Sequence, residues 1–376
     1  KAGSTGADVY TPGAPIYNPK ITYFVVGRMT GDGGSLVGID NDRTYASEFG
    51  LKIVKNGTSA GKINRYNYWT NGDKISTLDA TTVKGSNAIF GLAVRDDNAP
   101  SNVTAAGDTV VFVLNGQQEK VNQASALWTP HLAIGYDGFS GSEGSGTDEF
   151  EGDINEVMVF DSYLTLADRH RIATYLALKY GVTLKSEAGA ATNYVLSDGT
   201  TTIWSTATNT GFNNNIAGLV RDDNGLVDQR QAASSSSSMV AIANASFANS
   251  NAANTHQLSD KNAMMWGSDA GSAAFATAFT ASGMSHRMAR IFKIQETGTV
   301  GNVEVAIARS AIGGCPTNVN LIVSTDATIS GTDQILPMTS KMINGVEYFT
   351  VVTDLADAAY FTFGAFVGNP GGVGTD

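Results

Sequence analysis

Residues 150–160 read FEGDINEVMVF, and residues 164–184 continue as LTLADRHRIATYLALKYGVTL. The spacing of the apolar residues changes between these two stretches. The first ends in a short apolar run, which is typical of a strand. In the second, Ile172, Leu176 and Tyr180 recur at the spacing of one helix face. We therefore predict a strand that is followed closely by a helix.

Both ends of this helix carry capping signals. Thr165 can accept a hydrogen bond from the first turn, and Asp168 follows three residues later, as in a capping box. Gly181 can end the helix because glycine adopts the left-handed conformation without strain. We predict a helix over residues 165–180, which is the only strong helix signal in the chain, and a short strand over residues 182–184.

The first half of the chain alternates short apolar runs with turn sequences. Asn56-Gly57 and Asn115-Gly116 are dipeptides that tolerate the positive φ of tight turns. Parallel strands need a crossover helix, and this half offers none before residue 165, so we expect antiparallel pairing in a β-sandwich. The predicted strands are residues 21–26, 51–54, 88–94, 109–114, 131–134 and 154–160.

The second half repeats the strand pattern and predicts a second antiparallel sandwich. We place the domain boundaries at residues 1–188, 189–368 and 369–376, the last segment being a linker with the sequence Asn-Pro-Gly-Gly at 369–372. The predicted strands are residues 193–196, 201–204, 216–220, 239–242, 263–266, 288–294, 303–307, 321–323, 346–352 and 360–366.

Charge and length exclude several classes of function. The 376 residues are enough for two domains, and the net charge of -11 with a pI near 4.8 disfavours nucleic-acid binding, which needs a basic surface. No apolar run reaches the 18 residues of a membrane span, so we expect no membrane insertion. The lone cysteine, Cys315, excludes an intrachain disulfide.

The helix and the strand before it also carry a resemblance. Residues 150–160 with 164–184, and above all YLALKYGVTL at 175–184, resemble the closing strand and helix of LamG-like, concanavalin A-like jelly-roll modules in large bacterial surface proteins and adhesins. The resemblance implies a jelly roll, a non-catalytic role and an extracellular, cell-surface location.

The second half resembles the β-sandwich module that often follows such jelly rolls. The likeness is carried by residues 198–200, 212–223, 264–267, 290–298 and 303–307. Pro370-Gly371-Gly372-Val373 is similar to the lead into a jelly roll, and Lys1-Ala2-Gly3 is similar to the segment just after its first strand. The resemblance therefore implies that the first strand of the jelly roll is missing here, and that it is either supplied by a neighbouring segment or simply absent from this sequence.

Acidic residues in glycine-rich or turn segments can supply the oxygen ligands that calcium needs. The main segment is 137–153, and the turns at 96–98 and 222–224 are further candidates. None has the spacing of an EF-hand loop, and a solvated turn is the alternative interpretation of each. Calcium is the one cofactor that we expect. The candidate ligands are Asp96, Asp97, Asp137, Asp148, Glu149, Asp222 and Asp223.

Aromatic side chains in predicted loops are candidates for sugar binding, because their faces stack on sugar rings. Most aromatic residues of a sandwich belong to its core, which is the alternative for each of them. The candidates for ligand binding are Trp69, Trp128, Tyr136 and Phe139.

The acidic cluster at 148–156 invites comparison with the paired carboxylates of glycosidases. Alternate residues Glu149, Glu151 and Asp153 share a face only in a continuous strand, whereas Gly152 and the turn-rich residues 141–146 indicate a loop that enters a strand. The sequence has no His-Glu-x-x-His motif. We therefore expect no enzyme.

We expect the chain to be part of an extracellular bacterial adhesin that binds a glycan or a peptide, with calcium assisting. The alternative is a structural spacer or a self-assembling subunit of a surface fibre, in which the partners are neighbouring copies. A carbohydrate-active enzyme is the third possibility. Arrays of glycans and peptides, with and without calcium, distinguish the first from the second.

Overall fold

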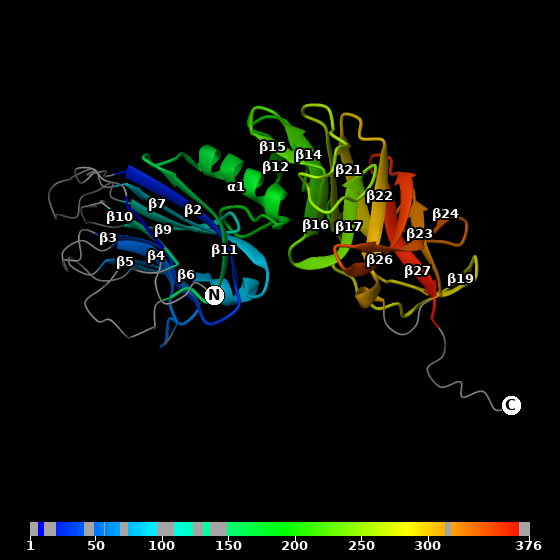
Figure 1. Ribbon diagram of the computed structural model, residues 1–376, viewed down its shortest axis with the longest axis horizontal. Coiled ribbons are helices and arrows are strands. Elements are labelled where there is room, and N and C mark those ends of the chain that lie inside the picture. The colour runs from blue at the N-terminus through cyan, green and yellow to red at the C-terminus, as the bar shows by residue number, and fades with distance from the viewer. Residues whose placement is uncertain are drawn as a thin grey trace. The chain divides into compact units, whose positions relative to one another are not determined.

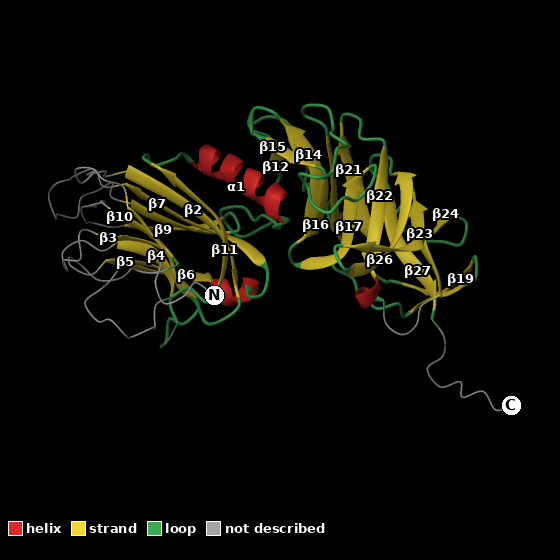
Figure 2. Cartoon of the chain, in the orientation of Figure 1, coloured by secondary structure: helices red, strands yellow, loops and turns green. Residues whose placement is uncertain are grey.

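The computed structural model describes residues 7–10, 20–40, 49–55, 57–67, 74–95, 109–122, 131–135, 149–312 and 317–367. Over these residues the chain forms antiparallel sheets, one α-helix, α1 (Leu166–Tyr180), and two short 3-10 helices, Ala80–Val83 and Arg309–Ala311 (Figure 2). The predicted all-β fold class is confirmed. No described helix has the length and apolarity needed to span a membrane.

The chain divides into two compact units (Figure 1). Unit 1 comprises residues 1–173 with 185–190, and unit 2 comprises residues 174–184 with 191–376. The division falls inside α1, and residue 188, where we placed the domain boundary, lies in the short segment that belongs to unit 1.

Unit 1 contains two antiparallel sheets. The six-stranded sheet has the order β1 (Ala7–Tyr10), β10 (His131–Ile134), β3 (Gly34–Asp40), β4 (Phe49–Ile53), β5 (Lys62–Asn67) and β6 (Lys74–Asp79). The five-stranded sheet has the order β11 (Gly152–Phe160), β2 (Lys20–Met29), β7 (Asn87–Arg95), β8 (Thr109–Leu114) and β9 (Gln117–Asn122).

The two sheets of unit 1 pack face to face. Alternate residues of β2, such as Tyr23 and Val25, meet Leu51 and Ile53 of β4 in one hydrophobic cluster. This is the packing of a sandwich, in which side chains of alternate residues fill the space between two sheets. The predicted antiparallel sandwich is thus present in unit 1.

The other face of the five-stranded sheet is covered as well. Ala93, Val111 and Val113 pack against Tyr163, which lies just before α1. The guanidinium groups of Arg95 and Arg169 lie 5.7 and 5.4 Å from the centre of the Tyr163 ring. Burial on both faces explains why β7 and β8 read as continuous apolar runs in the sequence.

Both predicted caps of α1 form. The Asp168 N–H donates to Thr165 Oγ1 at 3.1 Å, and the Thr165 hydroxyl donates to Asp168 Oδ2 at 2.7 Å. Gly181 has a φ of 66°, and the Val182 N–H donates to the Ala177 carbonyl at 3.0 Å. A side chain at position 181 would overlap the Ala233 carbonyl, so the sequence needs glycine there for two reasons.

Unit 2 also contains two main sheets. The nine-stranded sheet has the main order β15 (Val227–Gln229), β14 (Asn214–Asp222), β18 (Ala263–Ser268), β21 (Phe292–Thr297), β27 (Tyr360–Phe366), β20 (Met284–Arg287) and β19 (Thr277–Ala281). Its two remaining strands branch from β27: β23 (Thr317–Ser324) pairs with β27 and also with β24 (Gln334–Pro337). The five-stranded sheet has the order β16 (Gln231–Ser234), β17 (Ser237–Asn244), β22 (Asn302–Ala308), β26 (Val346–Asp354) and β25 (Thr339–Ile343). A two-stranded sheet pairs β12 (Tyr194–Val195) with β13 (Thr202–Trp204).

The core of unit 2 lies between these sheets. Trp266 and Phe361 of the nine-stranded sheet join Val305 and Phe349 of the five-stranded sheet in one cluster. The ring of Phe361 also stacks on Phe292, with 4.9 Å between the ring centres. Unit 2 is therefore a second antiparallel sandwich with its own core.

Tyr194 fixes the chain that comes after α1. Its buried hydroxyl donates to the Val182 carbonyl at 2.9 Å and accepts from the Leu184 N–H at 2.8 Å, and burial raises the pKa of this hydroxyl. Residues 182–184, for which we predict a strand, do not form one, because their backbone groups bond to the Tyr194 hydroxyl instead of to a neighbouring strand. That prediction was wrong.

Candidate functional site

Three of the predicted site residues, Glu149, Asp222 and Asp223, lie in the described part of the chain. The other predicted ligand-binding and metal-binding residues fall outside the described residues. They are Trp69, Asp96, Asp97, Trp128, Tyr136, Asp137, Phe139 and Asp148.

Glu149 lies beside the beginning of β3. It forms an isolated parallel bridge with Ser35, and its side chain is half-buried. A side chain at Gly34 would overlap the Glu149 carbonyl, so this glycine allows the two chain segments to approach closely. The use of Glu149 as a calcium ligand stays a prediction.

Glu151 and Asp153, the neighbours of Glu149 in the acidic cluster, are engaged in contacts within unit 1. The Glu151 carboxylate accepts from the Asp32 N–H at 2.8 Å and from Lys55 Nζ at 3.0 Å, and these two contacts lower its pKa. Asp153 accepts two hydrogen bonds from Arg28. Both carboxylates thus tie β11 to the segments around β2.

Asp222 ends β14 and is almost fully buried, at 2% exposure. Its carboxylate accepts from the Ser197 N–H at 2.7 Å, from the Ser197 hydroxyl at 2.9 Å and from the Gly225 N–H at 3.1 Å. Three donors satisfy most of the acceptor capacity of a carboxylate. Asp222 therefore holds the turn after β14 against the segment at Ser197.

Two exposed ion pairs lie near Asp222. Asp223 receives two hydrogen bonds from Arg221, at 2.7 and 3.1 Å. Asp198 accepts from the N–H groups of Thr200 and Thr201 and from Lys261 Nζ, and these contacts hold the pKa of Asp198 well below its usual range. The structure thus brings the predicted turn at 222–224 together with residue 198, but each carboxylate has donors of its own.

A different surface of unit 2 offers polar groups in an ordered array. The outer side of the five-stranded sheet carries side chains that the strand register places together, because residues on alternate positions point to one face. Lys341 lies opposite Tyr348, Thr339 opposite Thr350, and Glu304 opposite Val352. We call this surface the Lys341 face, and it comprises Glu304, Thr339, Lys341, Tyr348, Thr350 and Val352.

An ion pair lies at the centre of the Lys341 face. Lys341 Nζ is 2.8 and 2.7 Å from the two carboxylate oxygens of Glu304, although β26 lies between their strands. The Glu304 side chain is 5% exposed and that of Lys341 is 38% exposed. The Phe247 N–H also donates to Glu304, at 2.8 Å. The carboxylate is therefore fixed by three hydrogen bonds, while part of the Lys341 side chain faces solvent.

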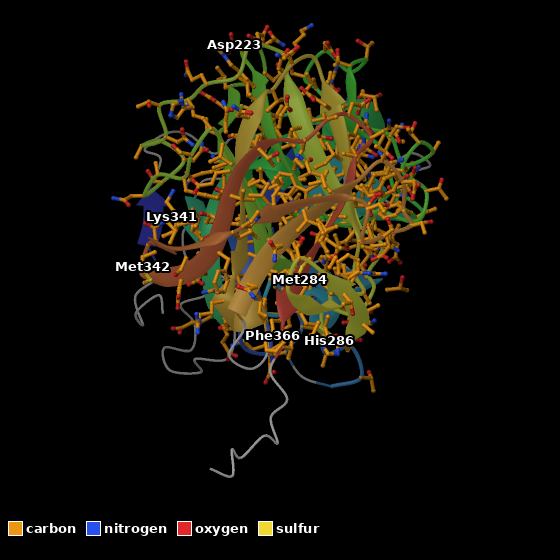
Figure 3. All side chains as sticks on the ribbon, turned by 90° about the vertical axis from the view of Figure 1, so that its right-hand side faces the viewer. Asp223, Met284, His286, Lys341, Met342 and Phe366 are labelled. Carbon is orange, nitrogen blue, oxygen red and sulfur yellow. The ribbon has the colours of Figure 1, made fainter. Side chains whose placement is uncertain are left out.

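Solvent-facing side chains surround this ion pair. Val352 is 54% exposed, Thr339 is exposed, and Tyr348 is half-buried. Figure 3 shows Lys341 next to Met342 and well apart from Asp223. Thr350, by contrast, is only 5% exposed. The face therefore combines the fixed ion pair with the exposed Thr339, the ring of Tyr348 and the side chain of Val352.

The Lys341 face is not apparent from the sequence. The period-two pattern at 346–352 predicts a strand, but nothing local links Lys341 to Glu304, which lies 37 positions earlier. The described residues also contain no group of three His, Cys, Asp or Glu side chains placed to hold a metal ion.

The fold and this surface define a chain of two antiparallel β-sandwiches with a polar sheet face. Residues 168–354 match a family described as "Domain of unknown function (DUF8202)", so the match covers most of unit 2 and begins within α1. No curated protein matches the chain.

Several solved structures share a low similarity with parts of the chain. One is "Mouse laminin alpha1 chain, domains LG4-5", with 14% identity, a TM-score of 0.30, 41% of this chain covered and only 38% of that chain. A second is "Ruminococcus gnavus IT-sialidase CBM40 bound to alpha2,3 sialyllactose", with 16% identity, a TM-score of 0.31 and coverage of 40% and 81%. A third is the "SAP-like pentraxin from Limulus polyphemus", with 13% identity, a TM-score of 0.30 and coverage of 46% and 85%.

Proposed function

We propose that this chain is a non-catalytic recognition region of an extracellular bacterial surface protein, and that the Lys341 face binds a neutral glycan. The observation that carries the proposal is the Lys341–Glu304 pair at the centre of that face. Its carboxylate is held in place by the Phe247 N–H as well as by Lys341, so the polar centre is fixed before any ligand arrives.

A sugar suits this pair because the oxygen of a sugar hydroxyl group accepts hydrogen bonds. The partly exposed Lys341 side chain can donate to it, while the nearly buried carboxylate of Glu304 holds the ammonium group in place, and hydrogen bonds to charged groups are stronger than neutral ones. The two charges cancel, which favours an uncharged ligand. Tyr348 and Val352 offer apolar surface for the C–H groups of a sugar ring.

Glu151 and Asp198 favour binding over catalysis at their two positions, because their pKa values are lowered, whereas a glycosidase needs an acid whose pKa is raised. Calcium assistance through Glu149 and its neighbours in sequence is part of the proposal for unit 1. The spacer or fibre role and the carbohydrate-active enzyme remain the alternatives.

The experiment is a glycan array, followed by calorimetric titration of the best ligand with the whole chain and two variants. Val352→Glu places a larger, charged side chain on the exposed part of the Lys341 face. We expect this variant to bind the glycan more weakly, by about tenfold or more, because the ligand would have to cover a carboxylate that has no partner. Val159→Glu is the matched control, since Val159 is a 46% exposed strand residue of unit 1.

Equal loss of affinity in the two variants, or none in either, would contradict the assignment to the Lys341 face. If no binding is detected on the glycan and peptide arrays and copies of the chain associate with one another in solution, the spacer or fibre role is favoured. A peptide ligand alone would replace the glycan in the proposal, and turnover of a polysaccharide would favour the enzyme.

A further inference from the structure

The hairpin that joins β25 to β26 ends in an Asn–Gly dipeptide. Ile343 pairs with Val346, so Asn344 and Gly345 form the whole two-residue loop, with φ values of 50° and 78°. Positive φ at both positions is the mark of a type I′ turn. Both residues are exposed, and a side chain built at position 345 would meet nothing within 4 Å.

We propose that Asn344–Gly345 is a modification site at which water converts the Asn344 amide to a carboxylate, through a cyclic imide. The backbone nitrogen of Gly345 attacks Asn344 Cγ, the new N–C bond closes a five-membered ring, and the Cγ–Nδ2 bond breaks. The amide nitrogen leaves as ammonia with the proton from the Gly345 nitrogen. Water then opens the ring at either carbonyl carbon and yields aspartate or isoaspartate.

The position of Asn344 makes this reaction accessible. Ring closure requires the turn to leave its starting conformation, and loop tips at the edge of a sheet open at low free-energy cost. β25 is the edge strand of the five-stranded sheet, so the hairpin has a neighbouring strand on one side only. Gly345 carries no side chain to hinder the attack, and the space around it is open.

The same chain contains a matched dipeptide that is protected. Asn115 and Gly116 join β8 to β9 with φ values of 51° and 92°. Here Asn115 is 7% exposed, its side-chain oxygen accepts from the Ile89 N–H at 2.7 Å, and its own N–H donates to the Ile89 carbonyl at 2.8 Å. The turn is the same, but opening it breaks contacts with β7.

The reaction at Asn344 has a structural consequence. Asn344 Nδ2 donates to the Asn249 carbonyl at 2.9 Å, which fastens the loop after β17 to the hairpin. Aspartate has no hydrogen to donate at that position and places a negative charge against a carbonyl oxygen. The modified hairpin therefore loosens this loop at Asn249, while Phe247 stays bound to Glu304.

The first test measures conversion of both dipeptides in the whole chain at mildly alkaline pH, by tryptic digestion and tandem mass spectrometry, with the urea-unfolded chain as reference. We expect both to convert at similar rates when unfolded, and Asn344 to convert about tenfold faster than Asn115, or more, in the folded chain. Equal rates in the folded chain, or faster conversion at Asn115, would overturn the assignment of the site.

The second test uses Asn344→Asp as the product of the reaction and measures hydrogen exchange of residues 245–250. We expect several-fold faster exchange than in the parent chain. Asn249→Ala is the control, because it keeps the backbone carbonyl that accepts the bond, and its exchange should match the parent. Unchanged exchange in Asn344→Asp would overturn the proposed loosening of the loop.

Discussion

Asp222 illustrates how a single buried carboxylate can organise a turn. It accepts hydrogen bonds from Ser197 and Gly225, two positions that are far apart in the sequence. Glu151 does the same for the turn after β2, where its backbone carbonyl also accepts from the N–H groups of Thr30 and Gly31. The donors to the Glu151 carboxylate lower its pKa, because each of them stabilises the anion.

Glu296 behaves in the opposite way. Burial raises the pKa of Glu296, and the charges of Asp354 and Asp357 raise it further, although the Val300 N–H donates to its carboxylate. The folded chain therefore holds a proton at Glu296 more tightly than the unfolded chain does. The resulting cost to stability is present above the folded pKa and disappears as the pH falls through that pKa towards the unfolded value.

We predict that Glu296→Gln raises the free energy of unfolding at neutral pH by about 0.5–1 kcal/mol, since glutamine keeps an acceptor for Val300 without the charge. Urea unfolding at a series of pH values should show this gain shrinking as the pH falls. Glu347→Gln is the control and should bring no gain, because Glu347 accepts from Arg309 and Ser340. A loss of stability in Glu296→Gln at neutral pH would contradict the interpretation.

At the scale of elements, α1 depends on its capped first turn. We predict that Thr165→Ala lowers the free energy of unfolding by about 1 kcal/mol, because the Asp168 N–H then loses its acceptor. The urea midpoint of the whole chain is the measurement. Thr299→Ala, at an exposed threonine that lies outside the helices and strands, is the matched control. An equal effect in the two variants would rule out the cap as the cause.

The elements also show how far a sequence can predict structure. α1 was predicted within one residue because its signals are local: the Thr165 cap, the apolar spacing and Gly181. β19 and β25 were missed because they are short edge strands in which only Phe279 is buried, and their pairing depends on distant residues. The Lys341–Glu304 pair was missed for the same reason, since only the sheet brings the two strands near each other.

At the scale of the whole molecule, the net charge of -11 leaves an excess of carboxylates, and calcium is the expected counterpart of the acidic segment at 137–153. We predict that calcium raises the unfolding temperature of the chain. A ligand present at a hundredfold excess over its Kd stabilises the folded state by about 2.7 kcal/mol. Differential scanning calorimetry with calcium, and with magnesium as the control ion, measures the shift.

Variants locate the source of that shift. Glu149→Gln should abolish it, whereas Asp223→Asn should retain it, because Asp223 is already paired with Arg221. An unfolding temperature that does not change when calcium is added would contradict the proposed cofactor. Loss of the shift in Asp223→Asn alone would assign the calcium site to the turn at 222–224 instead.

The Lys341–Glu304 pair has a further consequence for the edge of its sheet. A peripheral strand exposes backbone groups that other chains can pair with, and it can also detach and exchange between copies. The Lys341 side chain extends across β26 to the carboxylate of Glu304 on β22. β25 can therefore separate from the sheet only if the ion pair with this nearly buried carboxylate is broken. The side chain therefore ties the edge strand to the second strand inward, and this contact opposes strand exchange at the edge.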